Sequence, residues 1–252
     1  MTVRDLDGRV AVVTGGGRGI GRAIAGHLAA RGAHVVVAYL RNRTAAEAAC
    51  AELEDHAVKA LAVRANVGDP AQLDALFDVT EETFGRVDVF VSNAATGVLR
   101  DLDGLDARAW DWTMDANARA FFLAAKRAAA LMPNGGHMIA LSSQGSTRVL
   151  PGYTVVGASK AALEAVARYL AVELGPRGIR VNVVSPGVVD TEALRHFPAR
   201  EHMLTEGLRK TPLGRLATPE DVAAAVDFLT SDAAALVTGH TLVVDGGAGL
   251  LA

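Results

Sequence analysis

Short apolar runs alternate with longer segments of helical periodicity along the whole sequence. The runs are rich in β-branched residues and mostly apolar on both alternations, as is typical of strands that helices cover on both faces. A helix between two such strands returns the second strand parallel to the first, with a right-handed crossover. The sequence therefore predicts a parallel α/β sheet of seven strands, at residues 10–13, 34–38, 60–63, 87–91, 137–141, 179–184 and 241–244.

The intervening segments have the length of helices. They cover residues 20–31, 44–56, 70–84, 107–132, 153–175 and 219–229. No linker, internal repeat or low-complexity stretch interrupts the pattern. We therefore expect residues 1–252 to form a single domain, a doubly wound sheet of the Rossmann type with helices on both faces.

Composition and charge exclude several classes of function. The 25 basic and 28 acidic residues are scattered and leave a net charge of −3, which argues against nucleic acid as the main partner. No apolar run reaches the ~20 residues that span a bilayer, and the N-terminus does not resemble a signal peptide. The single cysteine, Cys50, fits a reducing compartment. We expect a cytoplasmic protein that binds neither nucleic acid nor membrane.

A glycine cluster, TGGGRGIG at residues 14–21, joins the first predicted strand to a helix. Glycines let the backbone approach a pyrophosphate, and the free N–H groups at a helix N-terminus favour an anion. The spacing differs from the G-x-G-x-x-G fingerprint, and a glycine cluster alone can be a plain turn. The position between strand and helix favours a dinucleotide site within a cofactor half at 1–140. The residues expected to form it are Gly15, Arg18, Gly19, Ile20 and Gly21.

The end of the second strand indicates which dinucleotide binds. NAD sites usually place an acidic residue about 20 residues after the glycines, on the ribose 2′-hydroxyl. Here the strand continues as YLRNR, and the first acid beyond it is Glu47. Arg41, Arg43 and Arg18 instead offer guanidinium groups that suit a 2′-phosphate, although solvated surface arginines are the alternative interpretation. We therefore expect NADPH as the cofactor.

Further motifs follow in a definite order, and together with the glycine cluster they resemble the short-chain dehydrogenase/reductase family over essentially the whole chain. They include SNAA at 92–95, Ser142-Ser143 after the fifth strand and VDGG at 244–247. The resemblance implies further residues that contact the cofactor. These are Asn66, Val67, Asn93, Ala94, Pro186, Gly187 and Thr191.

The tyrosine and lysine that the family uses stand at an unusual spacing. The usual gap is three residues, which would place the tyrosine at 156, but that residue is Val156. The nearest tyrosine is Tyr153, with six residues between it and Lys160. Seven residues turn a helix by about 700°, so both side chains still share one face, two turns apart.

The longer gap suits the reduction of an enoyl thioester. When hydride attacks a carbonyl carbon, negative charge collects on the oxygen of that carbon. When it attacks the β-carbon of an enoyl thioester, charge collects on the thioester oxygen, two carbons away. The acid must then stand further from the nicotinamide, and three residues shift the tyrosine backbone by ~4.5 Å along the helix.

The six-residue gap resembles that of the enoyl-acyl-carrier-protein reductases, most closely the NADPH-dependent type III enzymes, as do WDWTM at 110–114 and the segment 190–198. The resemblance implies that Tyr153 and Lys160 are catalytic, with Lys160 also on the cofactor ribose. It further implies that Asn117 orders a proton-relay water. Ser143 keeps the position of the ketoreductase serine and is expected to assist Tyr153, which would hydrogen-bond the thioester oxygen.

Residues 191–215 mix apolar and charged side chains, which predicts either a mobile lid over an acyl chain or a fixed pair of surface helices. No further ligands accompany the histidines there, so no metal site is expected. The family resemblance implies a homodimer or homotetramer. Basic residues in this segment would guide an acidic acyl carrier protein. They are Arg195, Arg200, Arg209 and Lys210.

Three functions remain open at the level of sequence. The expected one is NADPH-dependent reduction of an enoyl thioester in fatty-acid or polyketide synthesis. The second is reduction of a 3-oxoacyl thioester or another carbonyl, with Tyr153 reaching the ketone despite its shift. The third is a non-catalytic NADPH-binding module, which Val156 favours and which Asn117, Ser143 and Lys160 oppose.

Overall fold

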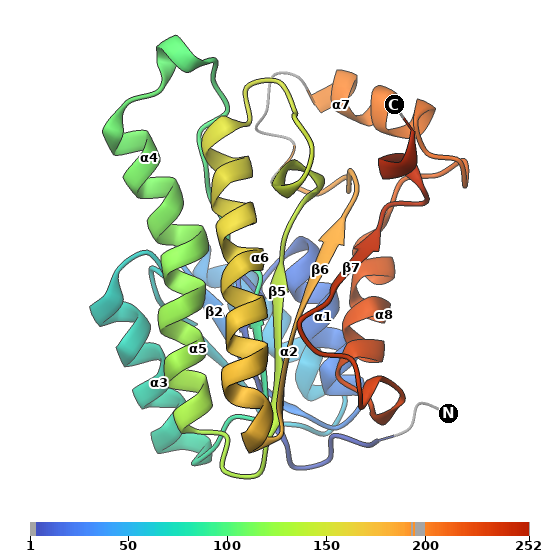
Figure 1. Ribbon diagram of the computed structural model, residues 1–252. Helices are drawn as coiled ribbons and strands as arrows, with labels where there is room; N and C mark the ends of the chain where they lie inside the picture. Colours follow the sequence, from blue (N-terminus) through green and yellow to red (C-terminus); the bar gives the residue numbers. More distant parts are fainter. Residues whose placement is uncertain (1–3, 193, 195–199, 252) are drawn as a thin grey trace.

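The computed structural model describes residues 4–192, 194 and 200–251. In this part of the chain one parallel sheet has seven strands in the order β3-β2-β1-β4-β5-β6-β7 (Figure 1). All seven predicted strands are confirmed, with small differences at their ends. The strands are β1 (Val10–Thr14), β2 (His34–Tyr39), β3 (Ala60–Arg64), β4 (Val89–Ser92), β5 (Gly136–Leu141), β6 (Ile179–Pro186) and β7 (Thr241–Val244).

Helices cover both faces of the sheet, which confirms the doubly wound Rossmann-type fold. One face packs against α1 (Gly19–Ala30), α2 (Arg43–Glu54) and α8 (Pro219–Leu229). The other packs against α3 (Pro70–Phe84), α5 (Ala120–Ala130) and α6 (Thr154–Leu174). The remaining α-helices of the described residues are α4 (Ala107–Met114) and α7 (Arg200–Arg209), which stands above the sheet in Figure 1.

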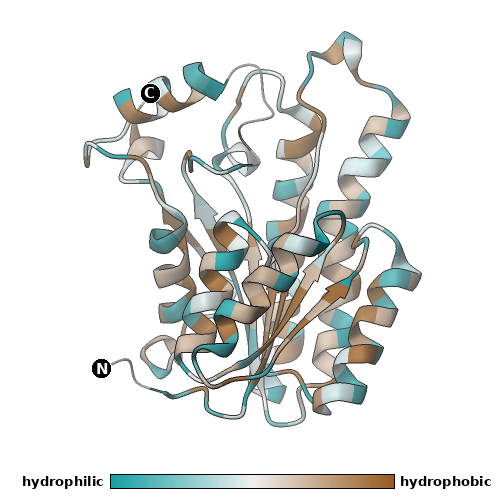
Figure 2. Cartoon of the chain, turned by 180° about the vertical axis from the view of Figure 1, so that it is seen from behind, coloured by the Kyte–Doolittle hydropathy of each residue, from teal (hydrophilic) through white to brown (hydrophobic). Residues whose placement is uncertain are grey.

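The strands contribute to two hydrophobic cores, one on each face of the sheet. Val13 and Val35 lie in the core beneath α1, α2 and α8, whereas Val12 and Val36 lie in the core beneath α3, α5 and α6. Successive side chains of a strand point to opposite faces, so a strand buried on both sides must be apolar throughout. Figure 2 shows these apolar strands between the helices. No helix in the described residues is long and apolar enough to span a membrane.

Local capping signals explain where α3 begins and ends and where α8 begins, as the sequence predicts. The Asp69 side chain accepts from the backbone N–H groups at the start of α3, Pro70 is its first residue, and Gly85 closes it with a left-handed φ of 71°. Thr218 and Asp221 form a reciprocal capping box at the start of α8. Such caps satisfy orphan backbone groups and require only nearby residues.

The segment 107–132 was predicted as one uninterrupted helix, and this is wrong in one respect. A π-helical turn at Asp115–Arg119 separates α4 from α5. The turn contains Asn117, whose Nδ2 donates to the Thr96 carbonyl (2.9 Å) and to Ser159 Oγ (2.8 Å), while its Oδ1 accepts from the Thr96 N–H (3.0 Å). Widened turns of this kind often occur at functional sites.

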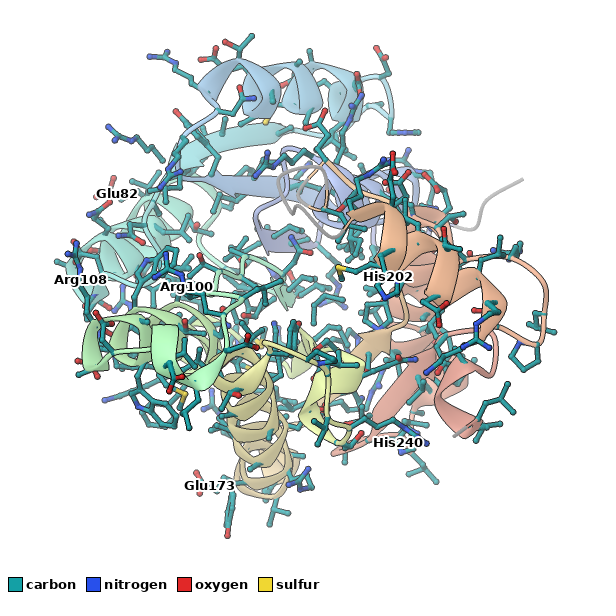
Figure 3. All side chains as sticks on the ribbon, turned by 90° about the horizontal axis from the view of Figure 1, so that it is seen from above. Glu82, Arg100, Arg108, Glu173, His202 and His240 are labelled. Atoms are coloured by element: carbon teal, nitrogen blue, oxygen red, sulfur yellow. The ribbon has the colours of Figure 1, made fainter. Side chains whose placement is uncertain are left out.

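The order of the strands reverses between β1 and β4, and the helices that follow them lie on opposite faces of the sheet, α1 on one and α5 on the other. In open α/β sheets, ligands bind outside the carboxyl ends of the strands at such a point. Figure 3 looks down on this end of the molecule. It shows α7, which carries His202, and the start of α4, which carries Arg108, on opposite sides.

Candidate active site

The glycine cluster forms a tight loop between β1 and α1. Gly15 and Gly19 have φ values of 67° and 52°, a region that L side chains rarely adopt. A Cβ added at Gly21 would overlap the Gly15 carbonyl oxygen and lie 2.5 Å from Asn93 Nδ2, so the backbone approaches too closely for any side chain. Arg18 makes no side-chain cap to α1, and the first turn of α1 holds no acidic residue. The helix N-terminus therefore suits an anion.

The segment after β4 is tied directly to this loop. Thr14 Oγ1 accepts from the backbone N–H groups of Asn93 and Ala94, both at 3.0 Å. Asn93 Nδ2 donates to the carbonyls of Thr14 (2.9 Å) and Gly15 (3.3 Å). Asn93 and Ala94 thus lie beside the glycine loop. Thr14, which fastens them there, was not singled out from the sequence, although a polar residue at the end of a buried strand is the signal.

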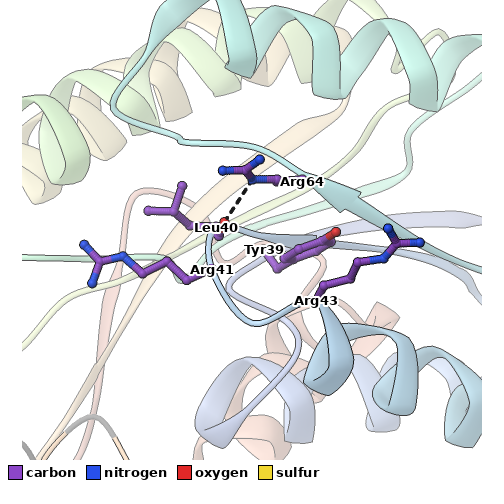
Figure 4. Close-up of a pocket in the computed structure, with 5 residues that line it drawn as sticks. All are labelled: Tyr39, Leu40, Arg41, Arg43 and Arg64. Atoms are coloured by element: carbon purple, nitrogen blue, oxygen red, sulfur yellow. Dashed lines mark hydrogen bonds between the residues drawn. The ribbon is translucent and has the colours of Figure 1, made fainter.

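A pocket of about 600 Å³ opens at the ends of β2 and β3 (Figure 4). Arg64 Nε donates to the Leu40 carbonyl (3.3 Å), and Arg43 is paired with Glu47 (2.7 Å). Among the ion pairs formed within the described residues, none includes Arg41. Three guanidinium groups against one carboxylate leave a positive charge suited to a phosphate. The lining residues are Tyr39, Leu40, Arg41, Arg43 and Arg64.

The arginines are arranged differently from the sequence-based expectation. Arg18 does not line this pocket, and its guanidinium lies 3.9 Å from the carboxylate of Glu192. Arg64 takes its place, because β3 pairs with β2 in a register that sets Tyr39 opposite Arg64. An arginine at the end of a predicted strand beside the cofactor strand was the available signal.

Other expected cofactor contacts lie around the same edge of the sheet. Asn66 accepts from the N–H of Gly68 (3.2 Å), and Gly187 N donates to the Val244 carbonyl (3.0 Å), directly after Pro186 ends β6. A Cβ on Gly19 would lie 3.6 Å from Thr191, so Thr191 is beside the glycine loop.

Two apolar residues among the expected cofactor contacts pack against the hydrophobic cores. Ile20 lies against the core beneath α1, and Val67 lies against the core on the opposite face of the sheet. Both side chains therefore help to pack the helix and loop that carry the other expected cofactor contacts.

Tyr153 and Ser143 meet above the end of β5. Tyr153 immediately precedes α6, and its hydroxyl donates to Ser143 Oγ at 3.2 Å. Burial raises the pKa of Tyr153, and the hydrogen bond with Ser143 offsets this in part. Val156 is buried, and its side chain packs so closely on Gly97 that a Cβ there would overlap it. A valine side chain therefore fills the position where the family usually has its tyrosine.

Lys160 is buried, about two helical turns further along α6 than Tyr153. Its Nζ donates to the Leu141 carbonyl at 2.6 Å, and burial lowers the pKa of Lys160 from 10.5 to about 8, although Glu164 acts in the opposite direction. Glu164 is itself buried and accepts from Ser142. Asn117 contacts Ser159, the neighbour of Lys160 in the chain, and makes no direct hydrogen bond to the lysine.

Lys160 is expected to destabilise the cofactor-free fold. Because its folded-state pKa lies below the ordinary value, the penalty is fully present below pH 8 and disappears as pH rises from 8 to 10.5. The difference between the two pKa values corresponds to about 3 kcal/mol. We expect Lys160→Met to raise the free energy of unfolding at pH 7 and to lose most of this advantage at pH 10. Urea denaturation at both pH values measures it.

The exposed Lys126 provides the matched control for this experiment. Lys126→Met keeps the chemical change but removes no buried charge, so stability should change little at either pH. A gain for Lys160→Met that is the same at pH 7 and pH 10 would contradict a buried-charge penalty.

The predicted lid is only partly described. Residues 193 and 195–199, which include Arg195, lie outside the described residues. The described part contains α7, where Arg200 pairs with Asp190 (2.7 Å) and Arg209 with Glu206 (2.8 Å). These carboxylates reduce the positive charge that was expected to guide a carrier protein.

Comparisons with known proteins agree with the geometry. Residues 15–249 match a family model described as Enoyl-(Acyl carrier protein) reductase. The chain is 42% identical to a 1-cyclohexenylcarbonyl-CoA reductase of Streptomyces collinus, over 97% of this chain and 88% of that protein. It is 39% identical to a 3-oxoacyl-[acyl-carrier-protein] reductase of Synechocystis sp., over 96% of this chain and 97% of that protein.

A solved structure is similarly close. A short-chain dehydrogenase from Burkholderia cenocepacia, in complex with NADP, superposes with a TM-score of 0.90 at 36% identity, covering 96% of this chain and 98% of that one. Fold, site and comparisons define a dinucleotide-dependent class of oxidoreductases. The chain belongs to the short-chain dehydrogenase/reductase family, which confirms the resemblance seen in the sequence.

Proposed function

We propose that this protein reduces the 2,3 double bond of an enoyl thioester with NADPH. The observation that carries the proposal is the position of the acid: Tyr153 bonds Ser143 at the start of α6, while Val156 fills the usual tyrosine position. The description of the matching family and the similarity to a cyclohexenylcarbonyl-CoA reductase support an unsaturated thioester substrate.

The residues present fit NADPH. The loop at Gly15 and Gly21 has no room for side chains and would hold the pyrophosphate at the start of α1. Arg41 and Arg64 would hold the 2′-phosphate in the pocket beside β2. The bound cofactor supplies the hydride that is added to the β-carbon of the substrate. Similarity to a structure solved with NADP supports this choice.

Tyr153 is the group that meets the developing negative charge. With substrate bound, its single O–H would turn from Ser143 Oγ to the thioester oxygen and stabilise the enolate that forms there, while the Ser143 hydroxyl would donate to the phenolic oxygen of Tyr153. Lys160 carries a positive charge below its pKa of about 8 and would favour transfer of the Tyr153 proton. Asn117 lies in a π-helical turn that its hydrogen bonds to Thr96 and Ser159 hold in place. From there it would order a water through which Lys160 is reprotonated.

The test compares crotonyl and acetoacetyl thioesters with the same purified enzyme, each as the coenzyme A and the acyl-carrier-protein derivative. NADPH consumption is followed by its absorbance. Consumption with the crotonyl thioester is the expected result. Consumption with the acetoacetyl thioester alone would overturn the enoyl assignment.

Carbonyl reduction is the second candidate. The 3.2 Å contact between Tyr153 and Ser143 reproduces a pair of hydroxyl groups that can bind a ketone oxygen. Similarity to a 3-oxoacyl-[acyl-carrier-protein] reductase also supports it. The non-catalytic alternative is set aside, because the chain belongs to a family of oxidoreductases.

Cofactor preference should depend on the arginine pocket. Replacing Arg41 or Arg64 with alanine removes a charged hydrogen-bond donor from the 2′-phosphate, so the KM for NADPH should rise about tenfold or more. The KM for NADH should stay nearly constant, because NADH lacks this phosphate. Steady-state kinetics with both cofactors measure the effect, and an equal rise for both would contradict the assignment.

The acyl carrier and the assembly are further parts of the proposal. Substrates on coenzyme A or on acyl carrier protein are both supported by the names of similar proteins. Large apolar side chains stand exposed on α4, α5 and α6, which supports burial between subunits of a homodimer or homotetramer. They are Trp110, Trp112, Phe122, Tyr169 and Val172.

A further inference from the structure

Gly145 lies directly beneath the ring of Tyr153. It is the middle residue of the short 3-10 turn Gln144–Ser146 that follows Ser143. A Cβ added at Gly145 would overlap the ring carbons Cδ1 and Cε1 of Tyr153, while the next neighbour, Leu150 Cδ1, would be at an ordinary 3.5 Å. Gly145 is not among the glycines with positive φ. Its backbone would therefore accept alanine, and the Tyr153 ring is what excludes a side chain.

A second glycine completes this contact from the side of the helix. A Cβ at Gly157 would lie 2.6 Å from the Gly145 carbonyl oxygen and 3.6 Å from Tyr153 Cδ1. Gly157 N also donates to the Tyr153 carbonyl (2.7 Å) in the first turn of α6. The backbone of the turn thus contacts α6 at Gly157, where no side chain intervenes. The Tyr153 ring contacts the turn at Gly145 for the same reason.

The opposite arrangement holds at position 156. There Val156 fills the space over Gly97, and a Cβ at Gly97 would overlap it. One glycine therefore receives the tyrosine and another receives the valine that stands three residues further along α6. The side chain that is absent at position 145 makes room for an aromatic ring at position 153.

We propose that Gly145, supported by Gly157, is a positioning residue that sets the Tyr153 ring so that its hydroxyl reaches Ser143. This deepens the proposed function and rests on it only in taking Tyr153 as the acid. Gly145 has no side chain that could donate or accept a proton, and its contact is with the ring of Tyr153 and not with the hydroxyl. It acts by leaving empty the volume that the ring occupies.

The first test is Gly145→Ala. The added methyl group must displace the ring and its hydroxyl, so kcat should fall at least about tenfold, whereas the Kd for NADPH should stay within about twofold. Gly175→Ala is the matched control, since Gly175 lies at the end of the same helix, has no atom within 4 Å of an added Cβ and has a negative φ. It should keep wild-type kcat. Wild-type kcat in Gly145→Ala would overturn the proposal.

A double variant separates positioning from general damage to the loop. In a Tyr153→Phe background the hydroxyl is already absent, so Gly145→Ala should lower kcat little further. Losses that multiply would overturn the proposal. The comparison uses whichever thioester the wild type reduces, so failure on crotonyl thioester contradicts the enoyl assignment and leaves this test intact.

Stability provides a readout that does not depend on activity. Gly145→Ala should lower the urea midpoint in the wild type, because the methyl group collides with the ring. In a Tyr153→Ala background the ring is absent, so the same change should have little effect. If the single variant Gly145→Ala does not fold, the double variant that combines Gly145→Ala with Tyr153→Ala should fold. An equal loss in both backgrounds, or a double variant that stays unfolded, would overturn the proposal.

Discussion

Tyr153→Phe is expected to lower kcat about 100-fold while the Kd for NADPH stays unchanged. The substitution keeps the ring that packs on Gly145 but removes the hydroxyl that bonds Ser143 at 3.2 Å. A single well-placed donor to a developing oxyanion contributes about 3 kcal/mol, which corresponds to this loss. Because the ring remains, the fold should be preserved. Turnover with saturating NADPH and fluorescence titration of NADPH measure the two quantities.

Tyr169 on the same helix is the matched control for this prediction. Its side chain is exposed on the outer part of α6 in the single chain, and Tyr169→Phe keeps the ring proposed to pack between subunits while it removes a hydroxyl outside the candidate active site. It should leave kcat and NADPH affinity at their wild-type values. Equal kcat for Tyr153→Phe and the wild type would remove Tyr153 from the mechanism and leave Ser143 as the group to examine.

Gly21→Ala is expected to weaken NADPH binding about 100-fold and also to lower stability. The new methyl group would overlap the Gly15 carbonyl oxygen and crowd Asn93 Nδ2, so the loop must move away from α1. Such a shift would separate the N–H groups at the start of α1 from the pyrophosphate. Overpacking of this kind costs about 1–3 kcal/mol of unfolding free energy. Titration with NADPH and urea denaturation measure both effects.

Gly26 in the same helix provides the control. A Cβ at Gly26 has no atom within 4 Å, so Gly26→Ala introduces the same methyl group without a collision. Alanine is the better helix former by up to about 1 kcal/mol, so stability should be equal or slightly higher. If Gly21→Ala binds NADPH as tightly as Gly26→Ala, the glycine loop does not hold the cofactor in the way proposed.

Local signals account for the elements that were predicted well. Asp69 and Pro70 at the start of α3, and Thr218 at the start of α8, specify helix starts through neighbours in the chain. The strands were recognised because burial on both faces requires continuous apolar runs. Each cap and each apolar run involves only a few consecutive residues, so it can be recognised in the sequence.

The break between α4 and α5 could not be read in this way. The π-helical turn holds Asn117 against Thr96 and Ser159, which lie 21 and 42 residues away in the chain. The composition of segment 107–132 is helical throughout, so periodicity alone predicts one helix. Contacts between distant residues decide where the backbone widens.

In the candidate site, too, the sequence predicted the features that depend on neighbouring residues and missed those that depend on packing. The order of motifs identified the family, and the spacing of Tyr153 and Lys160 placed both on one face of a helix. The spacing did not reveal that Lys160 is buried with a pKa of about 8, because that shift depends on the packing of α6 against the sheet. It also did not reveal Gly145, whose importance lies in the ring above it.

The sequence by itself determined the parallel α/β architecture, the family and the side chains available for chemistry, because periodicity, caps and motif order are properties of the chain read in one direction. Only the tertiary structure decided which of these groups meet. Arg64 joins Arg41 through the register of β3 on β2, while Arg18 lies instead beside Glu192. Burial and neighbours across the sheet set those pairings, and both arise only when distant segments pack together.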